Sequence, residues 1–463
     1  MILILVVIEL LFFILFFRFN NPSISFKNDA FFILLIVQVF AYTVLFPSAL
    51  AMDFPDILKS EYIQNILFSF IFFIIPLCLF YAFLRKVRFN LGNISVLSKN
   101  AQLTEGARIK NLFPLCMVWL LFEGMYLYFL CKNHLFYRRV GTEVIAQRLA
   151  NIPHVDLFFI RSVELIAIPV IALLWIALFK TRLNISLSAL QKKIVMFTLV
   201  VSFFAYAMTS LLNSRALFAE LFIFMTLIYF TFKSINLRKF YKQGIILLLF
   251  IVYLIFIIAN LRVYDKAKDS WLDLLNVTYS FKKSSESDAK LQWLSRMDCM
   301  DLITKMQPAL ENSGYAYGEA WQTPFLIAVG QFISPSLVHQ AKSQAVTTAK
   351  VYLMENYTQI VSKDYQSCSL TDVYGNFGYI GFVFAAIFFA FTFAILRYIL
   401  LNTNSLRVIF LGLILAVHLL IFEQEFISYL IGWIRYVPIA CILLLLIPKK
   451  VKSIPVSKDV RDA

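Results

Sequence analysis

Long apolar stretches constrain the fold of this 463-residue chain more than any other feature. Hydrophobic residues make up 61% of the sequence and charged residues 15%, whereas about a quarter of a soluble globular protein is charged. A helix needs about 20 apolar residues to cross a bilayer. The sequence therefore predicts an all-α polytopic membrane protein with about 11 transmembrane helices. The candidate spans are 1–17, 31–51, 63–84, 112–131, 156–179, 194–213, 216–232, 243–261, 376–396, 406–422 and 427–446.

One long polar interval separates the eighth candidate span from the ninth. It runs from Arg262 to Asp372 and is nearly neutral, with 11 basic and 12 acidic residues. Periodicity predicts one amphipathic helix from Asp288 to Met306 and a second from Ala345 to Lys363, with a turn between Tyr315 and Gly318. We expect these helices to form a lid on the membrane domain. The predicted organisation is spans 1–8 in 1–261, a large loop in 262–372, spans 9–11 in 373–447 and a basic tail in 448–463.

Basic residues in the short connections indicate the orientation of the chain. Lys and Arg concentrate in 85–111, 180–193, 233–242 and the C-terminal tail, which all fall on one side if there are eleven spans. Cytoplasmic loops carry such an excess. The large loop is therefore predicted to be external or periplasmic. The excess charge has this topological explanation, so the net charge of +15 does not indicate nucleic-acid binding.

Ionisable side chains occur inside or at the ends of several candidate spans, where they are costly and mark functional sites by default. Most of them lie in the outward half of their helices, which predicts a polar cavity open to the outside. Arg161 and Glu164, at i and i+3, either neutralise each other or serve function. Arg215, at a helix junction, is well placed to bind phosphate through its planar fork. The full set is Glu123, Arg161, Glu164, Arg215, Glu220, His418, Glu423, Glu425 and Arg435.

The cysteines and histidines show no metal-binding pattern. The six cysteines form no CxxC pair, and the four histidines are scattered. No metal and no cofactor are predicted, and no acidic DxD pair indicates a nucleotide-sugar site. Cys299 and Cys368 form either a disulfide in the large loop or two separate thiols.

A series of short motifs in the second half of the chain resembles the membrane-embedded polymerases of O-antigen and related oligosaccharide repeat units, the Wzy type. That family shows an arginine–aspartate pair, a YG element, an isoleucine–proline segment followed by a lysine, and an NFG–x–x–G element. A short arginine motif also follows one of its membrane spans. In this chain the corresponding residues are Ser214 with Arg215, Arg296 with Asp298, Tyr317 with Gly318, Ile333 with Pro335, Lys342, and Asn376, Phe377, Gly378 and Gly381.

Two departures from the family pattern are visible. Ser334 separates Ile333 from Pro335, and no arginine follows that proline. The motif order and spacing match from Ser214 to Gly381, whereas the first two hundred residues match only in hydropathy. Gly375, Gly378 and Gly381 are expected to permit a tight turn and a close helix approach.

The resemblance implies a membrane glycosyltransferase with a fold similar to the C-type glycosyltransferases. It would act at the outer face of a bacterial plasma membrane on oligosaccharide repeat units linked to undecaprenyl pyrophosphate. A chain-length regulator protein is an expected partner. Arg215, Arg296, Asp298 and Glu164 are the predicted catalytic residues. Arg161, Lys342, Tyr317 and Arg435 are the predicted substrate-binding residues.

Two other functions fit the same helices and charges. An O-antigen ligase would share the large outer loop and the arginines. A flippase or transporter of lipid-linked oligosaccharide would place its site near the bilayer midplane and often shows paired repeats. The sequence shows no such repeat, and the YG, proline–lysine and NFG–x–x–G series favours the polymerase.

Overall fold

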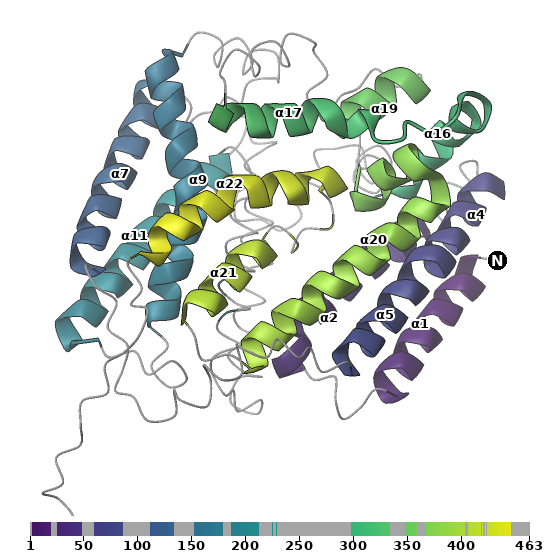
Figure 1. Cartoon of the computed structure of the whole chain (residues 1–463), viewed down its shortest axis with the longest axis horizontal. Coiled ribbons are helices and arrows are strands. Elements are labelled where there is room, and N and C mark those ends of the chain that lie inside the picture. The colour runs from purple at the N-terminus through teal and green to yellow at the C-terminus, as the bar shows by residue number, and fades with distance from the viewer. Residues whose placement is uncertain are drawn as a thin grey trace, which may run out of the picture.

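A computed structural model describes more than half of the chain. The described residues are 2–19, 26–48, 60–86, 112–133, 152–178, 187–212, 225, 228, 298–333, 348–358, 367–402, 406–417, 419, 422 and 424–445. Every regular element in these ranges is a helix (Figure 1). The elements are α1 (Ile2–Phe19), α2 (Phe26–Phe40), η1 (Ala41–Leu45), α4 (Ser60–Ser69), η3 (Phe70–Ile74), α5 (Ile75–Lys86), α7 (Leu112–Lys132), α9 (His154–Ala177), α11 (Ala189–Leu212), α16 (Met300–Ser313), α17 (Glu319–Ile333), α19 (Ala349–Tyr357), α20 (Ser369–Asn402), α21 (Leu406–Val417) and α22 (Phe426–Leu444).

Seven helices of the described part are long and apolar enough to cross a membrane. They are Phe31–Ser48, Ser60–Arg85, Leu112–Lys132, Phe158–Ala177, Ala189–Tyr206, Ser369–Leu400 and Phe426–Leu444. Two shorter apolar helices, Val7–Phe16 and Arg407–Val417, correspond to the spans predicted at 1–17 and 406–422. The all-helical character is thus confirmed for the described part, and the length and composition of these helices agree with a multi-pass membrane protein. The spans predicted at 216–232 and 243–261 lie outside the described residues, except for Met225 and Ile228.

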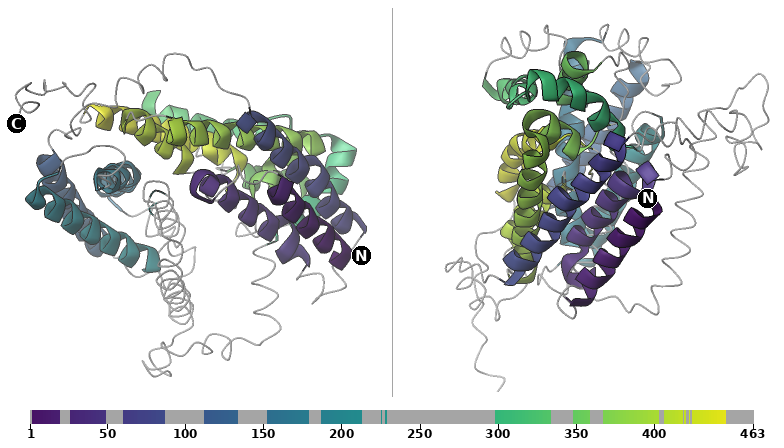
Figure 2. Two further views of the ribbon diagram at one scale, coloured as in Figure 1. Left: turned by 90° about the horizontal axis from the view of Figure 1, so that it is seen from below. Right: turned by 90° about the vertical axis from the view of Figure 1, so that its right-hand side faces the viewer.

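The membrane helices form two groups, which are joined by the last three helices of the chain. Figure 2 shows α7, α9 and α11 on one side of the molecule and α1, α2 and α5 on the other. The last three helices, α20, α21 and α22, connect the groups, since α21 and α22 contact α9 while α20 contacts α2 and α5. Aromatic side chains fill the packing around α20, where Phe389 meets Phe73, Phe426 and Tyr429.

Three short helices lie across one end of the bundle. We call α16, α17 and α19 the cap (Figure 1). The cap contacts the first turns of α4, α20 and α22, because Tyr62 bonds to Asp298, Asp372 to Trp321, and Glu425 to the backbone of α19. Lys132 at the end of α7 and Asp156 at the start of α9 form an ion pair of 2.9 Å.

Two helices predicted in the large loop differ from the helices observed in the cap. Asp298 and Cys299 precede α16, so the helix predicted from Asp288 to Met306 is wrong at these two positions; residues 288–297 lie outside the described part. The second predicted helix is shorter than expected, because Thr358 is extended (φ −139°, ψ 167°) and ends α19 at Tyr357. The turn predicted at Tyr315–Gly318 is confirmed, and α17 was not predicted.

A partly buried ion pair lies at the opposite end of the bundle. The Nε of Arg397 on α20 lies 2.8 Å from Oδ1 of Asp29, and the Tyr81 hydroxyl donates to the same oxygen at 2.6 Å. These contacts join α2, α5 and α20. These contacts were not predicted, since Asp29 and Arg397 lie just outside the predicted spans.

A sharp bend in α20 explains the spacing of the glycines in NFG–x–x–G. Gly378 has φ 62° and ψ −149°, a conformation that essentially only glycine adopts. A Cβ on Gly381 would overlap the carbonyl oxygen of Val373, on the other side of the bend. A Cβ on Gly375 would lie 2.5 Å from the Leu353 side chain of the cap. The predicted roles of these glycines in a tight turn and a close helix approach are confirmed.

Candidate functional site

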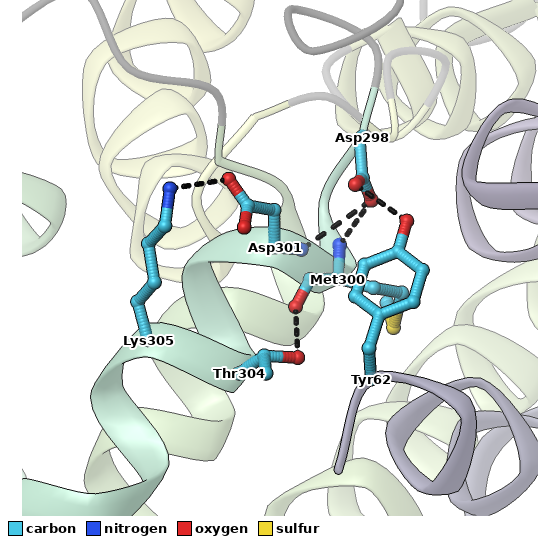
Figure 3. A network of polar contacts seen from close by, with 6 residues as sticks. All are labelled: Tyr62, Asp298, Met300, Asp301, Thr304 and Lys305. Carbon is cyan, nitrogen blue, oxygen red and sulfur yellow. Dashed lines mark hydrogen bonds and ion pairs between the residues drawn. The ribbon is translucent and has the colours of Figure 1, made fainter. Parts of the chain in front are cut away.

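In the described part of the chain, buried polar contacts are concentrated at the junction between the cap and the membrane helices. We call it the cap junction. At its centre, Asp298 is fully buried just before α16 (Figure 3). Its Oδ2 accepts a hydrogen bond from the Tyr62 hydroxyl at 2.6 Å. Its Oδ1 accepts from the backbone amides of Met300 at 2.8 Å and Asp301 at 3.4 Å. Asp298 therefore caps α16 and attaches it to α4.

Burial raises the pKa of Asp298 from an ordinary 3.8 to about 7. A carboxyl whose pKa is raised by folding contributes stability that is complete below its unfolded pKa and is lost as the pH rises through the folded value. We expect the free energy of unfolding of the wild type, relative to that of Asp298→Asn, to fall by a few kcal/mol between about pH 4 and pH 7. Denaturation of the detergent-solubilised proteins at several pH values measures this difference. A difference that does not change over this range would contradict the assignment.

A buried amide continues the junction along α4. The Asn65 Nδ2 donates to Thr304 Oγ1 at 3.0 Å and to Gln307 Oε1 at 3.1 Å, both on α16. Its Oδ1 accepts from the Tyr379 hydroxyl at 2.5 Å, just after the bend in α20. One asparagine thus uses both donors and its acceptor to join three helices. A buried polar group in this position is stabilising only because it is fully hydrogen-bonded.

Two of the predicted motifs are joined directly by backbone hydrogen bonds. Ala316 N donates to the Gly375 carbonyl at 3.0 Å, and Tyr317 N donates to the Asn376 carbonyl at 3.0 Å. Gly318 N donates to Asn376 Oδ1 at 2.7 Å, and the Asn376 Nδ2 donates back to the Asp372 carbonyl at 2.8 Å. We call this arrangement the clasp. It unites the YG and NFG–x–x–G elements into one structural unit.

Two further carboxylates cap helices at the same junction. Asp372 accepts from the amides of Phe426 and Ile427 at the start of α22, at 2.9 and 3.2 Å. It also accepts from the Trp321 indole of α17, at 3.0 Å. Glu425 accepts from the amides of Ala349 and Lys350 at the start of α19, at 3.1 and 3.0 Å. Burial raises the pKa of Glu425 above its ordinary value.

The described part contains four of the eight predicted site side chains. Asp298 and Tyr317 both belong to the cap junction. Asp298 contacts α4 through Tyr62, and Asn65 on the same helix leads to Tyr317 through Tyr379 and the rings of Tyr374 and Tyr315. Glu164 lies on α9, where it accepts from the Tyr126 hydroxyl at 3.3 Å, and half-buried Arg435 lies on α22, which packs against α9. Arg215, Arg296 and Lys342 lie outside the described residues, as does the side chain of Arg161.

The geometry of Asp298 favours a structural role over general-base catalysis. Three donors already occupy its carboxylate oxygens, and its side chain has no exposed surface. A general base needs to reach the proton that it abstracts, within about 3 Å. Glu425 has a similar capping role. Phe422 lies in a turn and Gln424 in a bend, just before α22.

Several residues of the cap junction were not predicted from the sequence. Tyr62 and Asn65 at the start of α4 make key contacts, but only ionisable residues within spans were considered. Asp372 was treated as the end of a loop. Its position could have indicated a role, because Asp372 lies four residues before Asn376, the first residue of the NFG–x–x–G motif. Cys299 and Cys368 are both buried, and no disulfide joins them.

In the described part, no group of three or more His, Cys, Asp or Glu side chains could hold a metal ion. The chemistry of the cap junction is that of carboxylates, phenols and amides, which position helices and bind hydroxyl groups.

Comparison of the chain with models of known protein families, with curated proteins and with solved structures finds no match in any of the three.

Proposed function

We propose that this chain is a polymerase of oligosaccharide repeat units, acting at the outer face of a bacterial plasma membrane on substrates linked to undecaprenyl pyrophosphate. The clasp is the observation that supports this proposal best. Two short motifs of the resemblance, separated by 58 residues between Gly318 and Asn376, meet through a specific set of hydrogen bonds. Chance matches of two short motifs have no reason to lie together in the folded protein.

The proposed reaction is a glycosyl transfer between two lipid-linked glycans. A hydroxyl of the acceptor repeat unit attacks the anomeric carbon of the donor's reducing-end sugar. The bond from that carbon to the pyrophosphate oxygen breaks, and the hydroxyl proton passes to a base. The products are a longer glycan on the acceptor lipid and free undecaprenyl pyrophosphate.

Cations are needed where the charge of the leaving pyrophosphate develops. Arg215 and Arg296 are the proposed ligands, since arginine binds phosphate bidentately, and Lys342 and Arg161 are the next candidates. Glu164 is the preferred base, because the alternative, Asp298, is fully buried and already accepts three hydrogen bonds. Its helix, α9, packs against α22, which carries Arg435.

Deletion of the gene tests the proposed function directly. A polymerase mutant is expected to retain surface lipid that carries single repeat units, visible as one short band after gel electrophoresis of the polysaccharide. Loss of all attached polysaccharide would indicate a ligase. Accumulation of lipid-linked units on the cytoplasmic side would indicate a flippase. Long chains of unchanged length would overturn all three assignments.

Substitution of the arginines tests the proposed site. We expect Arg215→Ala and Arg296→Ala to abolish chain extension while the protein still inserts in the membrane, because each removes a cation from the leaving group. Lys305→Ala is the matched control, since Lys305 is 46% exposed on the cap and pairs with its helical neighbour Asp301. Chain extension in the complemented deletion strain is the measurement. Normal long chains in both arginine variants would remove this site assignment.

A further inference from the structure

Tyr317 adopts a backbone conformation that its side chain disfavours. Its φ is 47°, and Tyr317 is the only non-glycine residue with a positive φ in the described part of the chain. Bulky residues rarely occupy this left-handed region, because Cβ approaches the following carbonyl. The clasp holds the conformation, since the amides of Tyr317 and Gly318 both bond to Asn376. A strained residue that its surroundings hold in place often serves function.

The fold makes little use of the Tyr317 side chain. The residue is 74% exposed, so glycine would serve the turn equally well and without strain. Its ring is nevertheless oriented, because it meets the Tyr315 ring edge-to-face at 6.4 Å and 87°. Tyr315 in turn lies over Gly378, where an added Cβ would come within 2.7 Å of its ring. Backbone and ring are therefore both preorganised, which lowers the entropy lost on binding a ligand.

The groups around Tyr317 are phenols and carboxylates. Glu319, two residues along the chain, accepts from the Tyr352 hydroxyl at 2.7 Å. This bond raises the pKa of Tyr352 to about 12, so its phenol is neutral at pH 7. Tyr357 lies close to Glu319, and Glu311 lies close to Tyr315. Such a surface disfavours an anionic lipid headgroup and offers hydrogen-bond acceptors to a ligand rich in hydroxyl groups.

We propose that Tyr317 is a preorganised stacking platform for a sugar ring of the glycan, with Glu319 and Tyr352 beside it to bind ring hydroxyls. An aromatic face takes the apolar CH face of a pyranose, and the flanking oxygens take its hydroxyl rim. The choice of a glycan as ligand rests on the proposed function. The platform binds the sugar portion of the substrate, away from the cations proposed for its pyrophosphate.

Binding of a free oligosaccharide tests the platform without chain extension. The probe is the repeat unit released by mild acid from the lipid-linked pool of the protein's own host. Titration of the purified full-length protein by calorimetry is expected to show affinity about tenfold weaker for Tyr317→Ala, the scale of one aromatic contact. Tyr317→Phe is expected to restore most of the affinity. Tyr128→Ala, which removes a 62% exposed tyrosine from α7, is the matched control and should bind as the wild type does.

Tyr317→Gly separates binding from folding. It removes the backbone strain and the ring together, so its melting temperature should equal or exceed that of the wild type while its affinity falls as in Tyr317→Ala. Unchanged affinity in Tyr317→Ala would overturn the platform even if the gene deletion shows polymerase activity. Weakened binding in Tyr317→Ala alongside normal chain length in the deletion strain would support the platform and reject the polymerase. Affinity that falls equally in Tyr128→Ala would also overturn the platform.

Discussion

Asp372→Ala is expected to lower the free energy of unfolding by about 3–5 kcal/mol. The fully buried carboxylate accepts from two amides at the start of α22 and from the Trp321 indole of α17. Alanine leaves these three donors buried without an acceptor. Denaturation of the detergent-solubilised protein, followed by tryptophan fluorescence, measures the change.

Two variants control for this prediction. Asp372→Asn keeps one acceptor oxygen and should lose about 1–2 kcal/mol, less than alanine. Asp301→Ala removes an acidic residue from the cap that pairs with exposed Lys305, and should change stability by less than about 1 kcal/mol. Equal losses in Asp372→Ala and Asp301→Ala would contradict the central role of Asp372.

Gly378→Ala is expected to destabilise the protein by about 3 kcal/mol or more, and Gly381→Ala by a similar amount. At Gly378 an alanine would be forced into a backbone region reserved for glycine, with its Cβ 2.7 Å from the Tyr315 ring. At Gly381 the new Cβ would overlap a backbone carbonyl, which cannot move aside as a flexible side chain can. Both changes should open the bend in α20. Loss of folded protein after extraction, or a lower melting temperature, measures the effect.

Gly124→Ala is the control for these glycine variants. Gly124 lies within α7, and a Cβ there would meet nothing within 4 Å. Alanine is also a better helix former than glycine by about 1 kcal/mol. This variant should therefore be neutral or slightly more stable. A loss at Gly124 equal to that at Gly378 would mean that the bend is not the reason for the expected damage.

Local rules were enough to predict the membrane helices and the glycine bend. A span such as 112–131 is a run of apolar residues whose length matches the bilayer, and α7 covers Leu112–Lys132. The glycines of NFG–x–x–G could be interpreted from sequence because a positive φ and a close approach both depend on the absence of Cβ. These features depend on the chain near each residue, so the sequence carries them directly.

Contacts between distant segments could not be predicted in the same way. Tyr62 and Asp298 are 236 residues apart, and nothing local to either residue indicates the other. The predicted helix wrongly included Asp298. Hydrophobic periodicity does not show that the Asp298 carboxylate accepts a hydrogen bond from the first amide of α16 and so precedes the helix. Apolar α17 was missed as a helix, and Pro324 lies in its second turn. Of the predicted site, Asp298 and Tyr317 share one junction, whereas the placement of Arg215, Arg296 and Lys342 stays a prediction.

The way in which the cap is attached has a consequence for its response to salt. Asp298, Asp372 and Glu425 hold the described cap helices through backbone amides, a phenol and an indole. These donors are neutral, and dissolved ions weaken attraction between exposed charges far more than hydrogen bonds within a dry interface. In concentrated sodium chloride the cap should therefore stay bound to the membrane helices, while the ion pair between Lys305 and Asp301 on its surface weakens.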